Sequence, residues 1–105
     1  MERINIISIE EAPKVPYNLE GRVLYTSVKT EIVHLTLKPG EKIDLHTQPF
    51  DVLFYVLEGN GLLLPGDSNN RLPAGSLAEV KAGLQRGWIN DTGNDFRVLV
   101  IKLLS

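Results

Sequence analysis

Short apolar runs separated by Gly, Pro, Asn and Asp recur along this chain of 105 residues. Runs of roughly four to eight residues bounded by such turn formers are typical of β-strands, and no stretch shows the apolar spacing of an amphipathic helix. A chain of this length supports one hydrophobic core, so we expect a single all-β domain over residues 1–105. The expected strands are residues 22–27, 31–37, 42–48, 52–58, 61–64, 76–80, 88–90 and 96–103.

Two of the connecting segments have the residue types of defined turns. Residues 38–41 (Lys-Pro-Gly-Glu) predict a type II turn, because Pro presets φ at the second position and Gly40 tolerates a positive φ at the third. Residues 58–61 (Glu-Gly-Asn-Gly) predict a tight hairpin between the strands on either side.

Two of the expected strands are apolar on both faces, namely residues 52–57 and 98–101. One face of each strand packs into the core, which leaves an apolar outer face without a covering surface. For so small a protein, we expect a second subunit to cover that face in a homodimer.

Composition and charge exclude several classes of function. The chain has no cysteine, which rules out disulfides, thiolate zinc sites and cysteine nucleophiles. Its formal net charge is -2 and its basic residues do not cluster, so we expect no nucleic-acid partner. The first residues are charged and no long apolar run follows them, so we expect no signal peptide, no membrane segment and a cytoplasmic location.

The region from Pro39 to Gly59 has the layout of a metal site that lacks most of its ligands. His46 and Gln48 are two residues apart in an expected strand, so their side chains leave the same face of that strand. Two coordinating groups at this spacing could bind one metal ion. His46 supplies an imidazole, but Gln48 offers only a neutral amide oxygen. Val52, where a carboxylate is expected, has no lone pair at all.

These positions resemble the motifs of the cupin superfamily, whose members are small double-stranded β-helix (jelly-roll) barrels. The first cupin motif runs from a glycine through a His-x-His pair and a glutamate to a second glycine, and its positions here are Gly40, His46, Gln48, Val52 and Gly59. The second motif is matched by residues 81–90, with Arg86 at the place of a histidine and Asn90 retained. The resemblance runs from about Glu31 onward and implies a barrel core over residues 31–103. It implies no particular activity, because cupins include several classes of enzyme, sensors and storage proteins.

Arg86 argues against a metal ion in this barrel. A positive charge about 4 Å from a divalent cation would cost roughly 8 kcal/mol at an effective dielectric constant of about 20. Arginine stays charged and presents a planar fork that matches carboxylate, phosphate or sulfate oxygens. If Arg86 points into the barrel, it favours an anion. Its length also allows it to reach solvent, or to pair with Asp51 or Glu79.

The histidines have two interpretations each. His46 is either a ligand-binding group or an imidazole hydrogen-bonded to Gln48 or to a backbone carbonyl. Asp44 has the same strand parity as His46, so it either holds the Nδ1 proton, as a general base requires, or faces water. His34 either approaches the same cavity as a second imidazole or is an ordinary strand histidine.

The favoured hypothesis is a metal-free cupin that holds a small anionic molecule in its barrel. Arg86 is its charge partner, and His46 and Gln48 are its hydrogen-bonding groups. Trp88 is either an apolar wall for the ligand or plain core. No catalytic residue, metal ion or cofactor is assigned.

Three alternatives stay open. The first is a metal-independent enzyme resembling the epimerase branch of the cupins, with His46 as base beside Asp44 and with Tyr25 or Tyr55 as acid. The second is a divergent metalloenzyme built from His46 and Gln48 with His34 or Asp44. The third is a structural or interaction role, with the barrel packed shut and the dimer surface as the functional part.

Overall fold

A computed structural model describes residues 3–16, 18–66 and 70–105 of the chain. These residues form nine strands, and their bounds are β1 (Glu20–Thr26), β2 (Thr30–Leu37), β3 (Lys42–His46), β4 (Asp51–Glu58), β5 (Asn60–Leu64), β6 (Arg71–Pro73), β7 (Leu77–Val80), β8 (Arg86–Ile89) and β9 (Phe96–Leu103). Within the described segments, no helix is long and apolar enough to cross a membrane.

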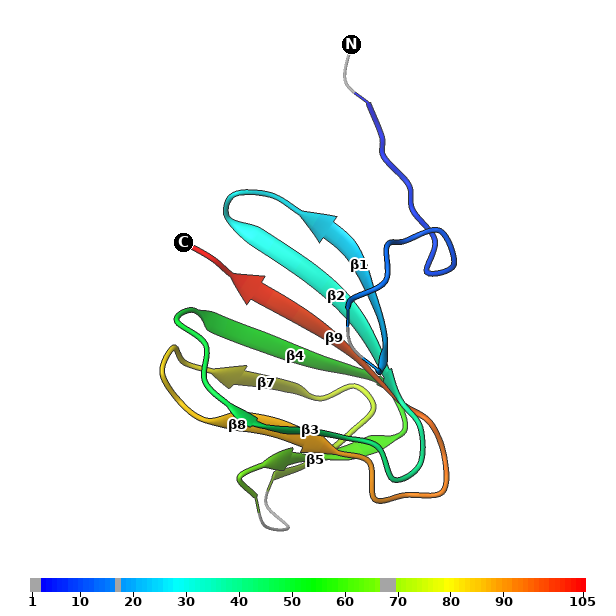
Figure 1. Cartoon of the computed structure of the whole chain (residues 1–105), viewed down its shortest axis with the longest axis vertical. Helices are drawn as coiled ribbons and strands as arrows, with labels where there is room; N and C mark the ends of the chain where they lie inside the picture. The colour runs from blue at the N-terminus through cyan, green and yellow to red at the C-terminus, as the bar shows by residue number, and fades with distance from the viewer. Residues whose placement is uncertain (1–2, 17, 67–69) are drawn as a thin grey trace.

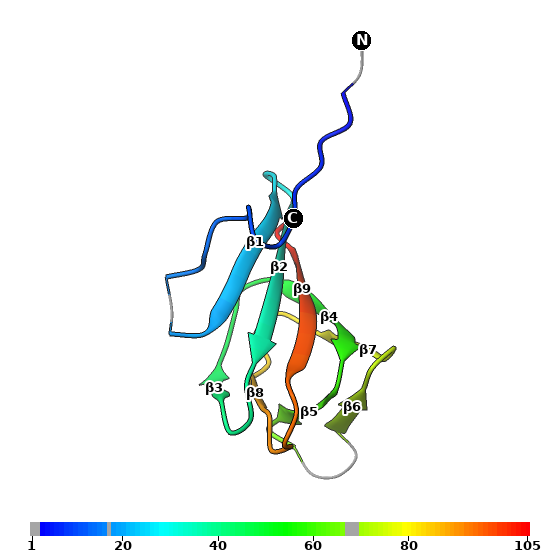
Figure 2. The ribbon, with the colours of Figure 1, turned by 90° about the vertical axis from the view of Figure 1, so that its right-hand side faces the viewer.

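The strands form two antiparallel sheets that enclose one interior. The larger sheet has the order β1-β2-β9-β4-β7 and the smaller sheet has the order β3-β8-β5-β6. Figure 1 shows the smaller sheet lying below the larger one, and Figure 2 shows both sheets curving around the same space. The expected all-β, double-stranded β-helix fold is confirmed.

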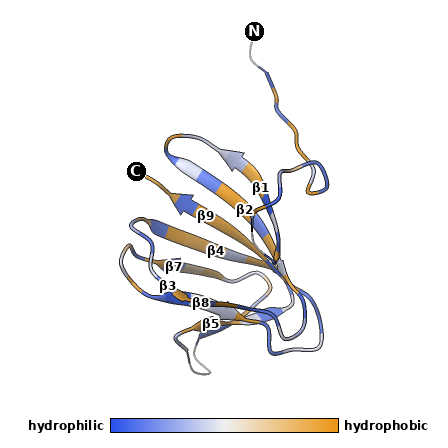
Figure 3. Cartoon of the chain, in the orientation of Figure 1, coloured by the Kyte–Doolittle hydropathy of each residue, from blue (hydrophilic) through white to orange (hydrophobic). Residues whose placement is uncertain are grey.

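The core lies between the two sheets. Every second residue of the central strands points inward, as the period of a strand requires, and the apolar stretches of β2 and β4 are visible in Figure 3. Phe96, Val98, Val56 and Leu37 are fully buried. The buried apolar residues are Val33, Leu37, Val52, Phe54, Val56, Val80, Trp88, Phe96, Val98 and Val100.

One turn prediction is confirmed and the other is wrong. Residues 38–41 form the expected turn, with Gly40 at φ +85° and a hydrogen bond of 3.0 Å from the Glu41 amide to the Lys38 carbonyl. Residues 58–61 do not form a hairpin, because β4 and β5 belong to different sheets. Gly59, at φ +73°, instead carries the chain from the larger sheet to the smaller one.

The strand boundaries differ from the expected ones at three places that matter for the site. Strand β3 ends at His46, so Gln48 lies just beyond it. Strand β8 begins at Arg86, two residues before its expected start. Strand β6 (Arg71–Pro73) was not expected at all.

The N-terminal segment leaves the body of the molecule. Residues 3–7 run away from the two sheets in Figures 1 and 2, and Ile4 and Ile6 are about nine-tenths exposed. The chain then turns back, and Lys14 pairs with Arg22 of β1 in an antiparallel bridge. Val15 follows and reaches the interior.

Candidate functional site

A cavity of about 380 Å³ lies between the two sheets. Its walls come from β2, β4 and β9 of the larger sheet, from β3 and β8 of the smaller one, from the segment between β3 and β4, and from the segment before β1. The lining residues are Val15, Leu19, Val33, Leu35, Ile43, His46, Gln48, Phe50, Val52, Phe54, Arg86, Trp88, Val100 and Lys102. Ten of these fourteen are apolar, which is the usual character of a site for a small organic molecule.

The four residues singled out from the sequence lie together on this lining. His46 and Arg86 are opposite each other in the pairing of β3 with β8, and Ile43 pairs with Trp88 further along. Arg86 and Trp88 are two apart in β8, so both side chains face the cavity. Gln48 joins them from the segment after β3. Their role in binding stays a prediction.

Arg86 is buried inside the barrel, with 2% of its surface exposed. Its Nε donates to the Leu84 carbonyl at 3.0 Å and its Nη2 donates to the Lys81 carbonyl at 3.1 Å. These two bonds hold the guanidinium in place without neutralising it. Burial lowers the pKa of Arg86, although a guanidinium remains charged at any ordinary pH.

The expected alternative pairings of Arg86 are wrong. Asp51 and Glu79 both pair with Lys81, at 3.6 and 3.3 Å. Among the residues whose positions are described, no carboxylate forms an ion pair with Arg86, and its Nη1 has no acceptor. A buried charge without a counter-charge is costly, so an anion in the cavity would be strongly favoured.

Trp88 combines a packed ring with a free donor. Its ring meets Phe54 edge-on, with centroids 5.3 Å apart, and it lies 4.9 Å from the Phe96 ring. Its indole Nε1 is buried and has no hydrogen-bond partner within the described part of the chain. Such an unsatisfied donor typically costs about 1–3 kcal/mol. The two interpretations of Trp88 are therefore compatible, because it is both core and cavity wall.

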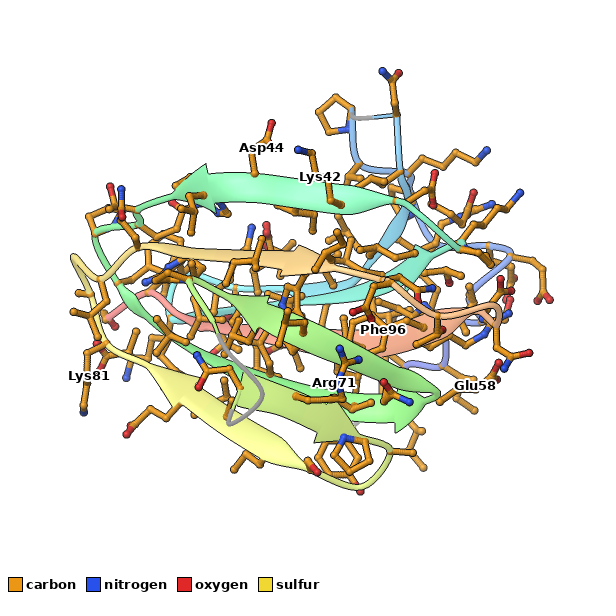
Figure 4. The ribbon with its side chains drawn as sticks, turned by 90° about the horizontal axis from the view of Figure 1, so that it is seen from below. Lys42, Asp44, Glu58, Arg71, Lys81 and Phe96 are labelled. Atoms are coloured by element: carbon orange, nitrogen blue, oxygen red, sulfur yellow. The ribbon has the colours of Figure 1, made fainter. Side chains whose placement is uncertain are left out.

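His46 is held by the backbone and not by a carboxylate. Its Nδ1 lies 3.0 Å from the Asp44 carbonyl oxygen. A carbonyl only accepts, so Nδ1 carries the proton, and Nε2 has no hydrogen-bond partner among the described residues. The Asp44 side chain is 85% exposed and pairs with Lys42 at 3.4 Å. Figure 4 shows the side chains of Asp44 and Lys42 pointing away from the barrel. The suggested Asp44–His46 carboxylate–imidazole pair is therefore wrong.

His34 and the two candidate acids lie on the outer face of the larger sheet. Val33 lines the cavity, so His34, the next residue of β2, points the other way. Tyr55 follows the cavity residue Phe54 in β4 and also points outward, and Tyr25 pairs with Ile32 beside Val33. His34 thus supplies no second imidazole to the cavity, and neither tyrosine reaches it as an acid.

Lys102 lines the cavity and was missed from the sequence. Its Nζ lies 2.8 Å from Oε1 of Glu31, and both side chains are less than one-third exposed. The available signal was strand parity, because Lys102 is two residues after Val100, which faces inward. The paired carboxylate cancels the charge of Lys102, which leaves Arg86 as the unpaired cation of the described lining.

The donors present do not fit a metal ion. In residues 3–16, 18–66 and 70–105, no three His, Cys, Asp or Glu side chains lie close enough together to hold one. The cavity places one imidazole beside a neutral amide, an aliphatic Val52 and a guanidinium. A divalent ion requires several carboxylate or imidazole ligands, and a nearby guanidinium repels it.

Comparison with protein families finds one match, to the cupin domain, over residues 33–102. No curated protein sequence matches the chain significantly.

Several solved structures share the fold. An uncharacterized conserved protein with a double-stranded β-helix domain from Klebsiella pneumoniae is 23% identical, with a TM-score of 0.79 over 96% of this chain and 90% of that chain. The polyketide cyclase RemF from Streptomyces resistomycificus is 16% identical, with a TM-score of 0.83 over 98% of this chain and 81% of that one. KdgF from a Halomonas species is 17% identical, with a TM-score of 0.79 over 94% and 93%. Likeness at these identities establishes the fold alone.

Proposed function

This chain belongs to the cupin domain family, and on that premise we propose that it binds a small anionic molecule inside its barrel without a metal ion. Arg86 is the charge partner, His46 and Gln48 supply further polar contacts, and Trp88 forms part of the wall. The chemistry of the lining supports a binding protein, and nothing in it requires a catalytic step.

One observation carries this proposal, namely that the guanidinium of Arg86 is buried, faces the cavity and has no carboxylate partner in the described structure. Burying an uncompensated charge is strongly unfavourable. An anionic ligand would supply the missing counter-charge and would accept from the free Nη1, in the bidentate geometry that arginine favours.

The enzyme alternatives receive less support from the same geometry. The Asp44 carboxylate points to solvent, and Tyr25 and Tyr55 lie outside the barrel, so His46 has neither an acidic orienting group nor an acid across the cavity. A metalloenzyme would need ligands that the lining lacks. A closed structural barrel is disfavoured by the open volume beside Arg86.

The test is a screen of carboxylates, phosphate and sulfate by thermal shift and calorimetry. We expect at least one class of anion to bind, and we expect Arg86→Gln to weaken that binding by about tenfold or more, since a bond to a charged group contributes about 1.5–3 kcal/mol. Arg97→Gln removes the same charge from the outer face and is the matched control.

Two results would contradict the proposal. The first is an anion affinity equal in the wild type and in Arg86→Gln for every ligand found. The second is near-stoichiometric iron, nickel, manganese or zinc in protein purified without added metal, measured by elemental analysis.

We further propose that the protein is a cytoplasmic homodimer and that it has no nucleic-acid partner. The apolar outer face of the larger sheet supports a second subunit, and the net charge of -2 disfavours a phosphate backbone. A fluorescent fusion tests the location.

A further inference from the structure

We infer that the ligand is an amphipathic monocarboxylate: one carboxylate joined to an aromatic or hydrocarbon body that carries a neutral acceptor oxygen several ångströms away. The carboxylate sits on Arg86 and the neutral oxygen accepts from Nε1 of Trp88. This inference rests on the proposed function and narrows it to one class of ligand.

The number of charges on the ligand follows from the charges on the cavity wall. Arg86 and Lys102 are the cationic side chains among the fourteen described lining residues, and Lys102 is paired with Glu31 at 2.8 Å. A single negative charge therefore balances the cavity. A second carboxylate, or a doubly charged phosphate, would be left against apolar side chains without a partner, which is strongly unfavourable.

The position of the second polar atom follows from strand geometry. Arg86 and Trp88 are two residues apart on one face of β8, so their Cα atoms are separated by roughly 7 Å. The indole N–H is a donor only and has no partner within the described part of the chain. Its nitrogen is buried, so a ligand oxygen would reach it through a small rotation of the indole ring. An acceptor displaced from the carboxylate by a few bonds would satisfy it, and a ketone, ether or ester oxygen has that character without adding a charge.

The body of the ligand follows from the rest of the lining. Apart from Lys102, which is paired with Glu31, the larger sheet contributes only apolar residues, Val33, Leu35, Val52, Phe54 and Val100. A sugar would bring a hydroxyl to nearly every carbon, and these walls offer no partner for most of them. A flat hydrocarbon or aromatic body buries its surface there at no such cost.

The test uses a matched set of synthetic probes. Benzoylpropionate has the carboxylate and the ketone, phenylbutyrate lacks the ketone, and benzoylpropionamide lacks the charge. Phenylsuccinate carries a second carboxylate, and inorganic phosphate carries no hydrocarbon. Each is titrated by calorimetry into the wild-type protein and into Arg86→Gln, Arg86→Lys, Trp88→Phe and Arg97→Gln.

We expect benzoylpropionate to bind most tightly. Loss of the charge, in benzoylpropionamide or in Arg86→Gln, weakens binding by about tenfold or more, and loss of the ketone weakens it by about threefold to tenfold. Trp88→Phe keeps the aromatic packing but removes the N–H, so it abolishes the preference for benzoylpropionate over phenylbutyrate. Arg97→Gln changes none of these values. The comparison of probes needs no variant, so it stands even if an Arg86 variant fails to fold.

A second measurement reports on the hydrogen bond directly. Trp88 is the one tryptophan of the chain, so its indole N–H gives a single resonance in a proton–nitrogen correlation spectrum. Benzoylpropionate should move this resonance downfield, whereas phenylbutyrate should not.

The outcomes separate this inference from the proposed function. Tighter, Arg86-dependent binding of phenylsuccinate or phosphate would overturn the monocarboxylate class and leave the proposed function standing. A ketone preference that persists in Trp88→Phe would overturn the role of Trp88. If neither these probes nor any anion of the wider screen binds in an Arg86-dependent way, the proposed function fails with the inference.

Discussion

Arg86 and His34 are both almost fully buried, yet their surroundings differ. Arg86 faces the cavity and is fixed by two backbone carbonyls, so it stays available to a ligand. His34 lies in the opposite direction from the cavity residues Val33 and Leu35. Burial of the imidazole lowers the pKa of His34, and the positive charge of Arg97 lowers that pKa further. The same degree of burial thus leaves an unpaired charge facing the cavity at Arg86 and lowers the pKa of His34.

His34 should make the stability of the protein depend on pH. In the unfolded chain its pKa returns to about 6.5, so below that pH the unfolded state takes up the proton first. The contribution of a neutral His34 is therefore complete above about pH 6.5 and is lost as the pH falls toward the lower pKa of the folded state. Urea unfolding at a series of pH values measures this fall.

His34→Gln should flatten that part of the pH profile. His46→Gln is the control, because His46 is exposed at the rim of the cavity and is the only other histidine. A profile that is the same in His34→Gln and in the wild type would contradict the assignment.

At the scale of the elements, the site depends on how β3 crosses β8. The pairing of these strands shifts register between Ile43 and His46, and the shift brings the β3 backbone close to Gly87. A Cβ on Gly87 would collide with the Ile43 carbonyl oxygen and crowd Asp44. Because Gly87 lies between Arg86 and Trp88, this close contact helps to fix both side chains in the cavity wall.

Gly87→Ala should therefore damage both the fold and the site. We expect the free energy of unfolding to drop by about 1–3 kcal/mol, as for other substitutions that create a backbone clash, and we expect the affinity for the anion to fall with it. Denaturant unfolding and calorimetry measure the two effects. Gly93→Ala is the matched control, because a Cβ there meets nothing within 4 Å. Equal stability of the two variants would show that β3 has room to move.

The sequence predicted the positions of the strands better than the way in which the strands join into sheets. Alternating apolar runs predicted eight of the nine described strands, and the glycine turn at 38–41 was predicted correctly. The turn at 58–61 was assigned to a hairpin because local turn chemistry specifies a reversal of the chain, not which sheet the next strand joins. Strand β6 is only three residues long and ends in Pro73, which hides it from any test of periodicity.

The sequence named the candidate site residues but left the direction of several side chains open. Arg86 and Trp88 were named from their positions in the second cupin motif, and the structure shows both on the cavity-facing side of β8. For Asp44, strand parity left two possibilities, a carboxylate on the His46 ring or one that faces water. The structure shows the second, in a strand whose pairing shifts register between Ile43 and His46. The pairing of Lys102 with Glu31 joins distant parts of the chain, and no local pattern reveals it.

At the scale of the whole molecule, the outer face of the larger sheet is apolar across several strands. The register places Ile32, Ile101 and Leu53 side by side, and Leu99 next to Tyr55. Tyr55 and Leu57 are 38% and 41% exposed, and Leu77, at the sheet edge, is 60% exposed. A continuous patch of this kind is more typical of an interface than of a free surface, and a second copy supplies a matching apolar face by symmetry.

We therefore predict a dimer with twice the chain mass of 11.7 kDa. Light scattering at micromolar concentration should give that value, and Tyr55→Glu should shift the protein toward the monomer because it buries a charge at the centre of the interface. Val28→Glu, in an exposed turn away from this face, is the control. A monomeric wild type would contradict the prediction.

The arrangement of the cavity walls has one more consequence. The smaller sheet supplies Arg86, Trp88 and His46, whereas the larger sheet supplies Lys102, paired with Glu31, and otherwise apolar side chains such as Val33 and Val100. Changing the size of those aliphatic groups would alter which molecules fit while leaving the anchoring arginine untouched. Under the proposed function, substitutions of the aliphatic residues in the larger sheet should change which ligand shapes fit, and substitutions at Arg86 should change which ligand charge is accepted.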